Sequence, residues 1–446
     1  MRASGTRART RRQERTPAPS ATGPEPAGPR PAPPGGQHAP DAVLLHVRPT
    51  QSGSFRLQRL VLPQLAAAAL VVGWVISPVV LVPAAVVAVL LVALAFVRRR
   101  GRSLPEWIVT ARALKARQRK AATTPIPPGT EPSLVPALEC EPALRTYSYG
   151  RRDQRPVGVV GDGTFVTAVL QVEADATALR AERSRQPLPV ALVRDALEVD
   201  GIRLESAQIV LHTQPAPALH LPKQSVAVAN YLPLQERTGA PAVRITWIAL
   251  KLDPELCAEA VAARGGGLLG AQKCVARAAD HLASRLTGAG FRARVLDEEE
   301  LVAALATSAC ANPLVTAEAG RGETRERRTE ESGHSWRCDN RRHTTYWVRR
   351  WPQLGEARGE SLPHFVARVT AIPALATTFS LTLAKGERQE VSLAAHLRVT
   401  GRSDDELVAA RRALESAARQ AGAGLARLDR EQLPGMLATL PLGGAR

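Results

Sequence analysis

The chain has 446 residues, 45% of them hydrophobic and 22% charged, and its formal net charge is +18. Residues 1–121 hold 19 Lys/Arg against 4 Asp/Glu, a net of +15, and the remaining 40 Lys/Arg against 37 Asp/Glu add only +3. A nucleic-acid-binding domain carries its basic residues on the folded region, so this distribution argues against that class for the large C-terminal part.

The first 50 residues are rich in proline, alanine and arginine and contain few large apolar side chains. Such a segment cannot bury enough apolar surface to offset the entropy lost on folding. The composition therefore predicts a disordered tail over residues 1–50.

An uncharged run of 38 residues extends from Leu60 to Val97. A membrane-spanning helix needs about 20 apolar residues, and Ser77-Pro78 divides the run because proline breaks a helix. Residues 51–97 are therefore predicted to form a transmembrane hairpin, with spans at about 60–76 and 79–97.

Basic residues flank this run on both sides, and the positive-inside rule then predicts that both termini are cytoplasmic. The expected location is the cell membrane, with two spans, and the expected counter-charge is anionic lipid at the cytoplasmic leaflet. The membrane-flanking basic residues are Arg56, Arg59, Arg98, Arg99, Arg100 and Arg102.

Residues 98–136 are predicted to form a basic juxtamembrane helix and a linker. Ser103-Leu104-Pro105-Glu106 has the form of a capping box, so a helix should start there and continue to about Ala121. Its two sides, one apolar and one basic, suit either a helix on the membrane surface or a solvated connecting helix. Residues 122–136, with five prolines, read as the linker.

Residues 137–311 have the hydrophobic patterns of an α/β domain half. Strands are predicted at Val157–Val172 (a hairpin turning at Gly161–Gly163), Ala207–Leu211, Val243–Leu252 and Arg292–Leu296, and helices at Val190–Val199, Leu268–Leu286 and Glu298–Ala306.

Residues 312–335 are charged and are predicted to be a linker before a second half at 336–446. There, strands are predicted at His343–Val348, Thr377–Leu383, Val391–Val399 and Leu425–Leu428, and helices at Leu362–Val369 and from Ser403 onward. Both halves can be read in the split βαβ order. The predicted fold class is therefore α/β (α+β): a two-helix transmembrane hairpin followed by a cytoplasmic α/β domain with two possible split βαβ-like halves.

No residue pattern predicts a catalytic, cofactor-binding or metal site. Gly265–Gly270 precedes a helix but lacks the Lys-Ser/Thr ending of a phosphate-binding loop. Glu298–Glu300 reads as an acidic first helical turn. Cys338, Asp339 and His343 could suggest a thiol nucleophile, although a free thiol in a cytosolic protein usually packs. The five cysteines are scattered and form no disulfide or zinc pattern.

The stretch from Arg341 to Pro352 interleaves arginines with aromatic residues. Such residues could stack on single-stranded nucleic acid, but the alternation also fits a strand with one packed face, which the nearly neutral surroundings favour. The candidate interaction residues on it are Arg342, His343, Tyr346, Trp347, Arg349, Arg350 and Trp351.

The order of these motifs resembles the EccE family of type VII (ESX) secretion membrane components. The resemblance rests on Arg98–Trp107, Tyr147–Tyr149, Gly161–Gly163, Val243–Leu252 and His343–Pro352. It implies a non-enzymatic assembly subunit of the inner-membrane secretion complex, without cofactors, whose soluble domain docks against EccB-, EccC- and EccD-like partners.

Two other functions remain open at this point. One is a membrane-anchored, transferase-like enzyme acting on a phosphate-bearing substrate near Gly265–Gly270. The other is a membrane-tethered nucleic-acid binder, which the charge distribution disfavours.

Overall fold

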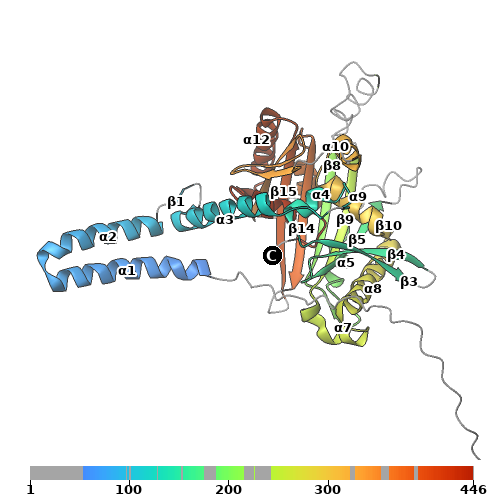
Figure 1. The fold of residues 1–446 in the computed structure, drawn as a ribbon, viewed down its shortest axis with the longest axis horizontal. Helices are drawn as coiled ribbons and strands as arrows, with labels where there is room; N and C mark the ends of the chain where they lie inside the picture. The colour runs from blue at the N-terminus through green and yellow to red at the C-terminus, as the bar shows by residue number, and fades with distance from the viewer. Residues whose placement is uncertain are drawn as a thin grey trace, which may run out of the picture. The chain divides into compact units, whose positions relative to one another are not determined.

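The protein is described here from a computed structural model (Figure 1). It describes residues 54–444 apart from 97, 100–101, 128, 152–153, 175–186, 215–225, 227–242, 322–326, 353–360 and 386–389. The predicted tail at residues 1–50 lies outside the described residues.

The uncharged run forms two helices, α1 (Ser54–Ile76) and α2 (Pro78–Phe96), which separate at Ser77. No helix in the described part of the chain is long and apolar enough to cross a membrane. The predicted two-span transmembrane hairpin is therefore wrong. Helix α1 takes in Arg56 and Arg59, and the break at Ser77 leaves two shorter helices with an internal proline each, whereas a span needs about 20 continuous apolar residues.

Two short strands, β1 (Arg98–Arg99) and β2 (Arg102–Ser103), pair before helix α3 (Leu104–Thr123). The predicted helix start at the Ser103–Glu106 motif is confirmed. Leu114 is buried on α3, whereas Arg112, Lys115, Arg119 and Lys120 are exposed. One side of α3 is therefore packed and the other is basic.

Among the described residues after α3, 12 strands form one large antiparallel sheet. Its main path runs β11-β12-β13-β15-β14-β8-β9-β5-β4-β3, with β10 added to β5 and β16 added to β13. In chain order, the first six strands of this sheet are β3 (Arg145–Arg151), β4 (Gln154–Gly161), β5 (Val166–Ala174), β8 (Ser206–Gln214), β9 (Val243–Leu252) and β10 (Phe291–Val295). The other six are β11 (Thr329–Glu331), β12 (Trp336–Cys338), β13 (Arg341–Arg350), β14 (Ala376–Lys385), β15 (Val391–Gly401) and β16 (Gly424–Arg427).

The helices after α3 are divided between the two halves of the α/β body. The first half has α4 (Val135–Cys140), α5 (Val190–Asp195), α7 (Ala258–Ala263), α8 (Gly267–Gly288) and α9 (Glu298–Ser308). The second has α10 (Pro313–Gly320), α11 (Leu362–Thr370), α12 (Asp404–Gln420) and α13 (Gln432–Leu437). A two-strand ribbon, β6 (Glu198–Val199) and β7 (Ile202–Arg203), and a 3₁₀ turn at Pro254–Cys257 complete the first half. Helices α9, α11 and α12 begin at the side-chain caps Asp297, Ser361 and Ser403, as their sequences indicate.

The two halves have the same topology. In the first, strands β5, β8, β9 and β10 occupy the spatial order β10-β5-β9-β8, with α5 and α8 as the crossover helices. In the second, β13, β14, β15 and β16 occupy the order β16-β13-β15-β14, with α11 and α12 in the same roles. Each half is thus a split βαβ unit, preceded by two further strands and followed by one more helix.

The halves are joined edge to edge by β8 and β14, which lie side by side in Figure 1. These strands pair antiparallel from Ala207 opposite Leu383 to Thr213 opposite Thr377. The backbone groups at both edges are satisfied by this pairing, as buried backbone polar groups must be. The halves are therefore parts of one continuous sheet.

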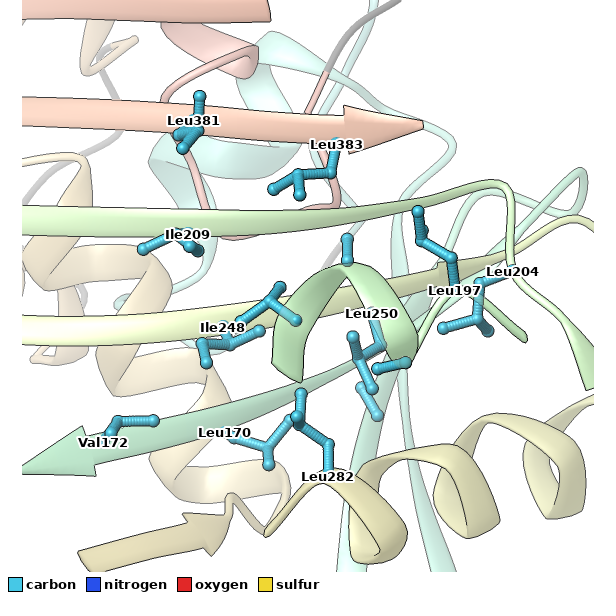
Figure 2. Packing of buried hydrophobic residues seen from close by; sticks show 14 of the residues in the cluster. Leu170, Val172, Leu197, Leu204, Ile209, Ile248, Leu250, Leu282, Leu381 and Leu383 are labelled. Carbon is cyan, nitrogen blue, oxygen red and sulfur yellow. The ribbon is translucent and has the colours of Figure 1, made fainter. Parts of the chain in front are cut away.

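Two hydrophobic cores lie on opposite faces of the sheet. Helices α5, α8, α11 and α12 pack on one face. On that face Ile209 of β8 lies near Leu381 and Leu383 of β14, and Leu282 of α8 lies near Leu170 (Figure 2). Helices α4, α9 and α13 cover the other face, against residues such as Trp247 and Trp336. The apolar packing on the first face continues across the joint between the halves.

The second face contains a polar link across the same joint. The Gln208 amide, fully buried, donates hydrogen bonds to Ser380 Oγ at 2.8 Å and to the Ala438 carbonyl at 2.9 Å. Its oxygen accepts from the Gly443 N–H at 2.8 Å. One side chain of the first half thus holds a strand of the second half and the C-terminal segment.

We expect Gln208→Leu to lower the free energy of unfolding by about 1–3 kcal/mol, because the buried Gly443 N–H loses its acceptor. Urea denaturation of the full chain measures the effect. Gln171→Leu is the control: its amide bonds Glu173 in an exposed pair, so a change within about 0.5 kcal/mol is expected. Equal effects of the two substitutions would contradict the role of Gln208.

Candidate docking surface around helix α3

Helix α3 is fastened to the edge of the sheet by one arginine. Arg117 Nε and Nη2 donate to the two carboxylate oxygens of Glu331 on β11, at 2.8 and 2.9 Å, and Nη2 also donates to the Arg430 carbonyl at 2.6 Å. The Glu331 side chain is only 5% exposed. Such a bidentate, largely buried pair fixes orientation as well as position.

Two further contacts hold the same helix. The Gln118 side chain donates to the Glu331 carbonyl at 2.8 Å, and the Arg430 guanidinium lies 3.9 Å from the centre of the Trp107 ring, a cation–π distance. Helix α3 therefore packs on the α/β body along one side, and its basic side stays exposed.

A buried ionic network lies beside β11. Arg328 donates to both carboxylate oxygens of Asp339 at 2.8 and 2.9 Å. The Glu139 carboxylate accepts from the backbone N–H groups of Arg328 and Thr329 at 2.9 and 2.6 Å, and Arg327 donates to the Glu139 carbonyl at 2.6 Å. This network ties residues 327–329 to α4, which the charged composition of residues 312–335 did not indicate.

A cavity of about 460 Å³ opens between α3, residues 124–127, α4 and α13. Its apolar lining includes Ile126, Leu138, Leu433 and Leu437. The volume is within the range of ligand sites. Arg117 and Arg327 at its wall are bound to protein acceptors, as described above, and Lys120 at the wall is exposed. The cavity therefore combines an apolar lining with the cation of Lys120.

The predicted interaction strand is β13. Because side chains alternate between the two faces of a strand, its candidate residues do not share one face. His343 and Tyr346 are buried, and the Tyr346 hydroxyl donates to Glu415 at 2.8 Å. Trp347 is 41% exposed, beside exposed Arg349 and Arg350.

The two ends of β13 are held by contacts within the protein. Arg342 lies 2.8 Å from Asp404, and the Trp351 ring lies 6.2 Å from that of Phe365. Together with the buried residues, these contacts leave Trp347, Arg349 and Arg350 as the exposed members of the predicted set.

The membrane-flanking arginines fall at the edge of the described part. Arg56 and Arg59 belong to α1, Arg98 and Arg99 to β1, and Arg102 to β2. Arg100 lies outside the described residues.

A buried cluster of two histidines and one arginine crosses the joint between the halves, and the sequence patterns did not point to it. His212 Nδ1 lies 3.0 Å from Thr378 Oγ1, and His343 Nδ1 lies 2.9 Å from Thr400 Oγ1. Arg398 donates to Thr378 Oγ1 at 3.1 Å. Alternation along β8, β13 and β15 places all three on one face, but only the strand pairing brings them together.

The cluster is electrostatically unusual because a buried cation lies beside two basic rings. Arg398 is fully buried and donates to the Ser308 carbonyl and the Met436 sulfur. Burial, reinforced by the Arg398 charge, lowers the pKa of His212 to about 3 and lowers the pKa of His343 well below its usual value. Both imidazoles are therefore neutral near neutral pH.

The possible nucleophile at Cys338 is not assembled. Cys338 is buried, and burial followed by the Asp339 charge raises the pKa of its thiol well above the usual value. A protonated thiol is a weak nucleophile. The Asp339 carboxylate binds Arg328, and His343 bonds Thr400.

The glycine-rich segment is the entry to α8. Gly265 and Gly266 have φ of 110° and 68°, a region that favours glycine, and the Gly266 carbonyl accepts from the Gly270 N–H at 2.8 Å. The Glu298–Glu300 run forms the first turn of α9, where Glu300 and Asp297 make a capping box. Within the described residues no group of three or more His, Cys, Asp or Glu could hold a metal ion.

One comparison with known proteins found a similarity to a family of secretion proteins. Residues 240–348 match the family model "Putative type VII ESX secretion system translocon, EccE". The search of curated proteins gives no match. The matched segment runs from β9 to β13 and so bridges both halves.

The match supports a type VII secretion system component, and the predicted resemblance to the EccE family is confirmed over this segment.

The buried histidines predict an acid-dependent loss of stability. In the unfolded chain a histidine binds a proton below its ordinary pKa of 6.5, whereas native His212 does so only near 3. Because the unfolded state binds more protons in this window, the free energy of unfolding should fall as the pH drops through 6.5, by up to about 1.4 kcal/mol per pH unit for each such group.

Urea denaturation at several pH values between these two pKa values measures the slope. His212→Gln should make it shallower by about 1.4 kcal/mol per pH unit, whereas His364→Gln, at an exposed position, should leave it unchanged. An unchanged slope in His212→Gln would refute the linkage.

Proposed function

We propose that this protein is a non-enzymatic assembly subunit of a type VII secretion complex, and that its α/β body docks against neighbouring subunits. The observation that carries the proposal is the family match over residues 240–348. That segment includes β9 and α8 of the first half and β13 of the second.

The way the chain uses its polar groups supports a structural role. Side chains that could perform acid–base or nucleophilic chemistry, such as His212, His343 and Cys338, are buried and bonded within the sheet. Arg117 and Arg328 are used in internal ion pairs that hold α3 and β11. These interactions build a rigid body with defined edges, which is what a docking subunit needs.

The test is purification of the tagged full chain from its native membranes in mild detergent. Other secretion components, those of the EccB, EccC and EccD kinds, should remain bound in a fixed ratio. Deleting the gene should reduce the amount of assembled complex, and the unmodified chain should restore it. Recovery of a lone monomer under several gentle conditions would count against the proposal.

We also propose that the exposed basic face of α3 contacts anionic lipid. Arg112, Lys115, Arg119 and Lys120 are exposed, whereas Arg117 on the same helix is bound to Glu331. Each basic side chain near an anionic surface contributes about 1 kcal/mol.

Co-sedimentation of the full chain with phosphatidylglycerol vesicles measures this contact. Replacing the four exposed residues by Glu should abolish binding that weakens with added salt, whereas Arg117→Ala should change it little. Binding that is equal on phosphatidylcholine vesicles would contradict an electrostatic contact.

A further inference from the structure

The repeated topology gives the sheet two equivalent outer edges. Strand β11 is the first strand of the second half and β3 is the first strand of the first half, and each ends the main path of the sheet. Both form a hairpin-like pair with the next strand, β12 and β4 respectively. The contacts made by the backbone of the β11 edge can therefore be compared with those of the β3 edge.

The β11 edge is closed by side chains of the chain itself. The Thr329 N–H donates to Glu139 at 2.6 Å, and the Thr329 carbonyl accepts from Arg327 at 3.1 Å. The Glu331 carbonyl accepts from Gln118 of α3 at 2.8 Å. The outward backbone groups of this short strand thus have partners, which protects an edge from pairing with other chains.

The outward direction of the β3 backbone follows from one hydrogen bond. Ser148 lies opposite Gly158 of β4, and the Gly158 N–H donates to the Leu296 carbonyl at 2.9 Å, away from β3. In an antiparallel pair of strands, two opposed residues either form two N–H···O=C hydrogen bonds with each other, or the N–H and C=O groups of both residues point away from the partner strand. The N–H and C=O of Ser148 therefore point to the open edge.

Among the described residues, nothing closes this edge as α3 closes the other. No hydrogen bond from them reaches the backbone N–H or C=O of Ser148, and Ser148 is exposed. Strand β3 is also longer than β11, with 7 residues against 3, and it contains no proline or lysine. Its register with β4 shifts between Tyr149 and Arg151, so the regular part of the edge runs from Arg145 to Tyr149. A strand of this kind is a template for strand addition.

The charge of β3 favours one kind of binding partner for its open edge. The strand sequence RTYSYGR contains two arginines and no acid. Arg145 at its start is exposed, and its Nη1 donates to the Pro142 and Leu144 carbonyls, neutral acceptors that do not cancel its charge. A second copy of the same strand would bring like charges together, which is unfavourable across a pair of strands. An extended segment that carries carboxylates near its ends would find complementary charge.

We propose that β3 is a docking edge, at which an extended, acidic-ended segment of another secretion component adds a further strand to the sheet. This inference rests on the proposed assembly role and names the surface that performs it. The main-chain bonds of Ser148 would supply affinity, and Arg145 would favour an acidic partner.

The first test uses the full chain and a labelled peptide of sequence EVTVTVE, with KVTVTVK as its charge-reversed counterpart. Fluorescence anisotropy should show the acidic peptide binding at least about tenfold more tightly. Ser148→Pro removes the outward N–H and should abolish binding, while Ser148→Ala keeps that N–H and should retain it. No binding, or binding that Ser148→Pro leaves unchanged, would overturn the proposal.

Proline is tolerated on an edge strand where its missing N–H faces outward, so Ser148→Pro should unfold at nearly the same urea concentration as the parent. A second experiment uses the unmodified chain. Two forms of the acidic peptide are N-methylated on alternate residues, one on the odd and one on the even positions. Only the form that loses the N–H groups facing β3 should bind more weakly. Equal affinity of both methylated forms and the parent peptide would exclude main-chain pairing.

Hydrogen exchange in the purified complex separates this inference from the proposed function. The amides of β3 should exchange much more slowly in the complex than in the isolated chain. If the chain co-purifies with its partners but the β3 amides still exchange fast, the docking role of β3 is wrong and the proposed assembly role still holds. Self-association sensitive to Ser148→Pro would show a second copy as the occupant and would also overturn it.

Discussion

The rest of the structure depends on the pairing of β8 with β14. This ladder joins two split βαβ units through their edge strands, from Ala207 opposite Leu383 to Thr213 opposite Thr377. A free edge strand carries a row of unpaired backbone groups, so either half alone would expose one in the middle of what is now the sheet. Joining them buries both edges and lets the apolar core on the α8 and α12 face continue from Ile209 to Leu381.

The same joint explains the polar interior on the opposite face. Gln208, His212 and Arg398 are fully buried there, and a buried polar group is costly unless it is bonded. Their partners come from both halves and from the C-terminal segment that follows α13. The C-terminal residues thus complete the hydrogen bonding of the joint.

The two outer edges of the sheet have the same topology but make different contacts. The chain closes the β11 edge with α3, through Arg117 and Gln118, and the described residues leave the Ser148 edge of β3 unclosed. Two topologically equivalent edges therefore differ in what they can bind. Closing one of the two edges keeps copies of the chain from adding to one another without limit through both edges.

The sequence by itself determined most of the local structure. Alternation predicted β9 and β13, helical spacing predicted α8, and the serine caps placed the starts of α11 and α12, because these signals depend on neighbouring residues alone. The motif order also led to the EccE family, which the match over residues 240–348 confirms.

Only the tertiary structure decided how these elements are used. The apolar run suggested two membrane spans, but the described helices are not long and apolar enough for that. Arg328 and Arg398 look like surface residues in the sequence, yet both are buried. Their partners, Asp339 and Thr378, meet them only through the sheet. Burial and pairing across the sheet depend on which strands become neighbours, and that choice is made by contacts between distant parts of the chain.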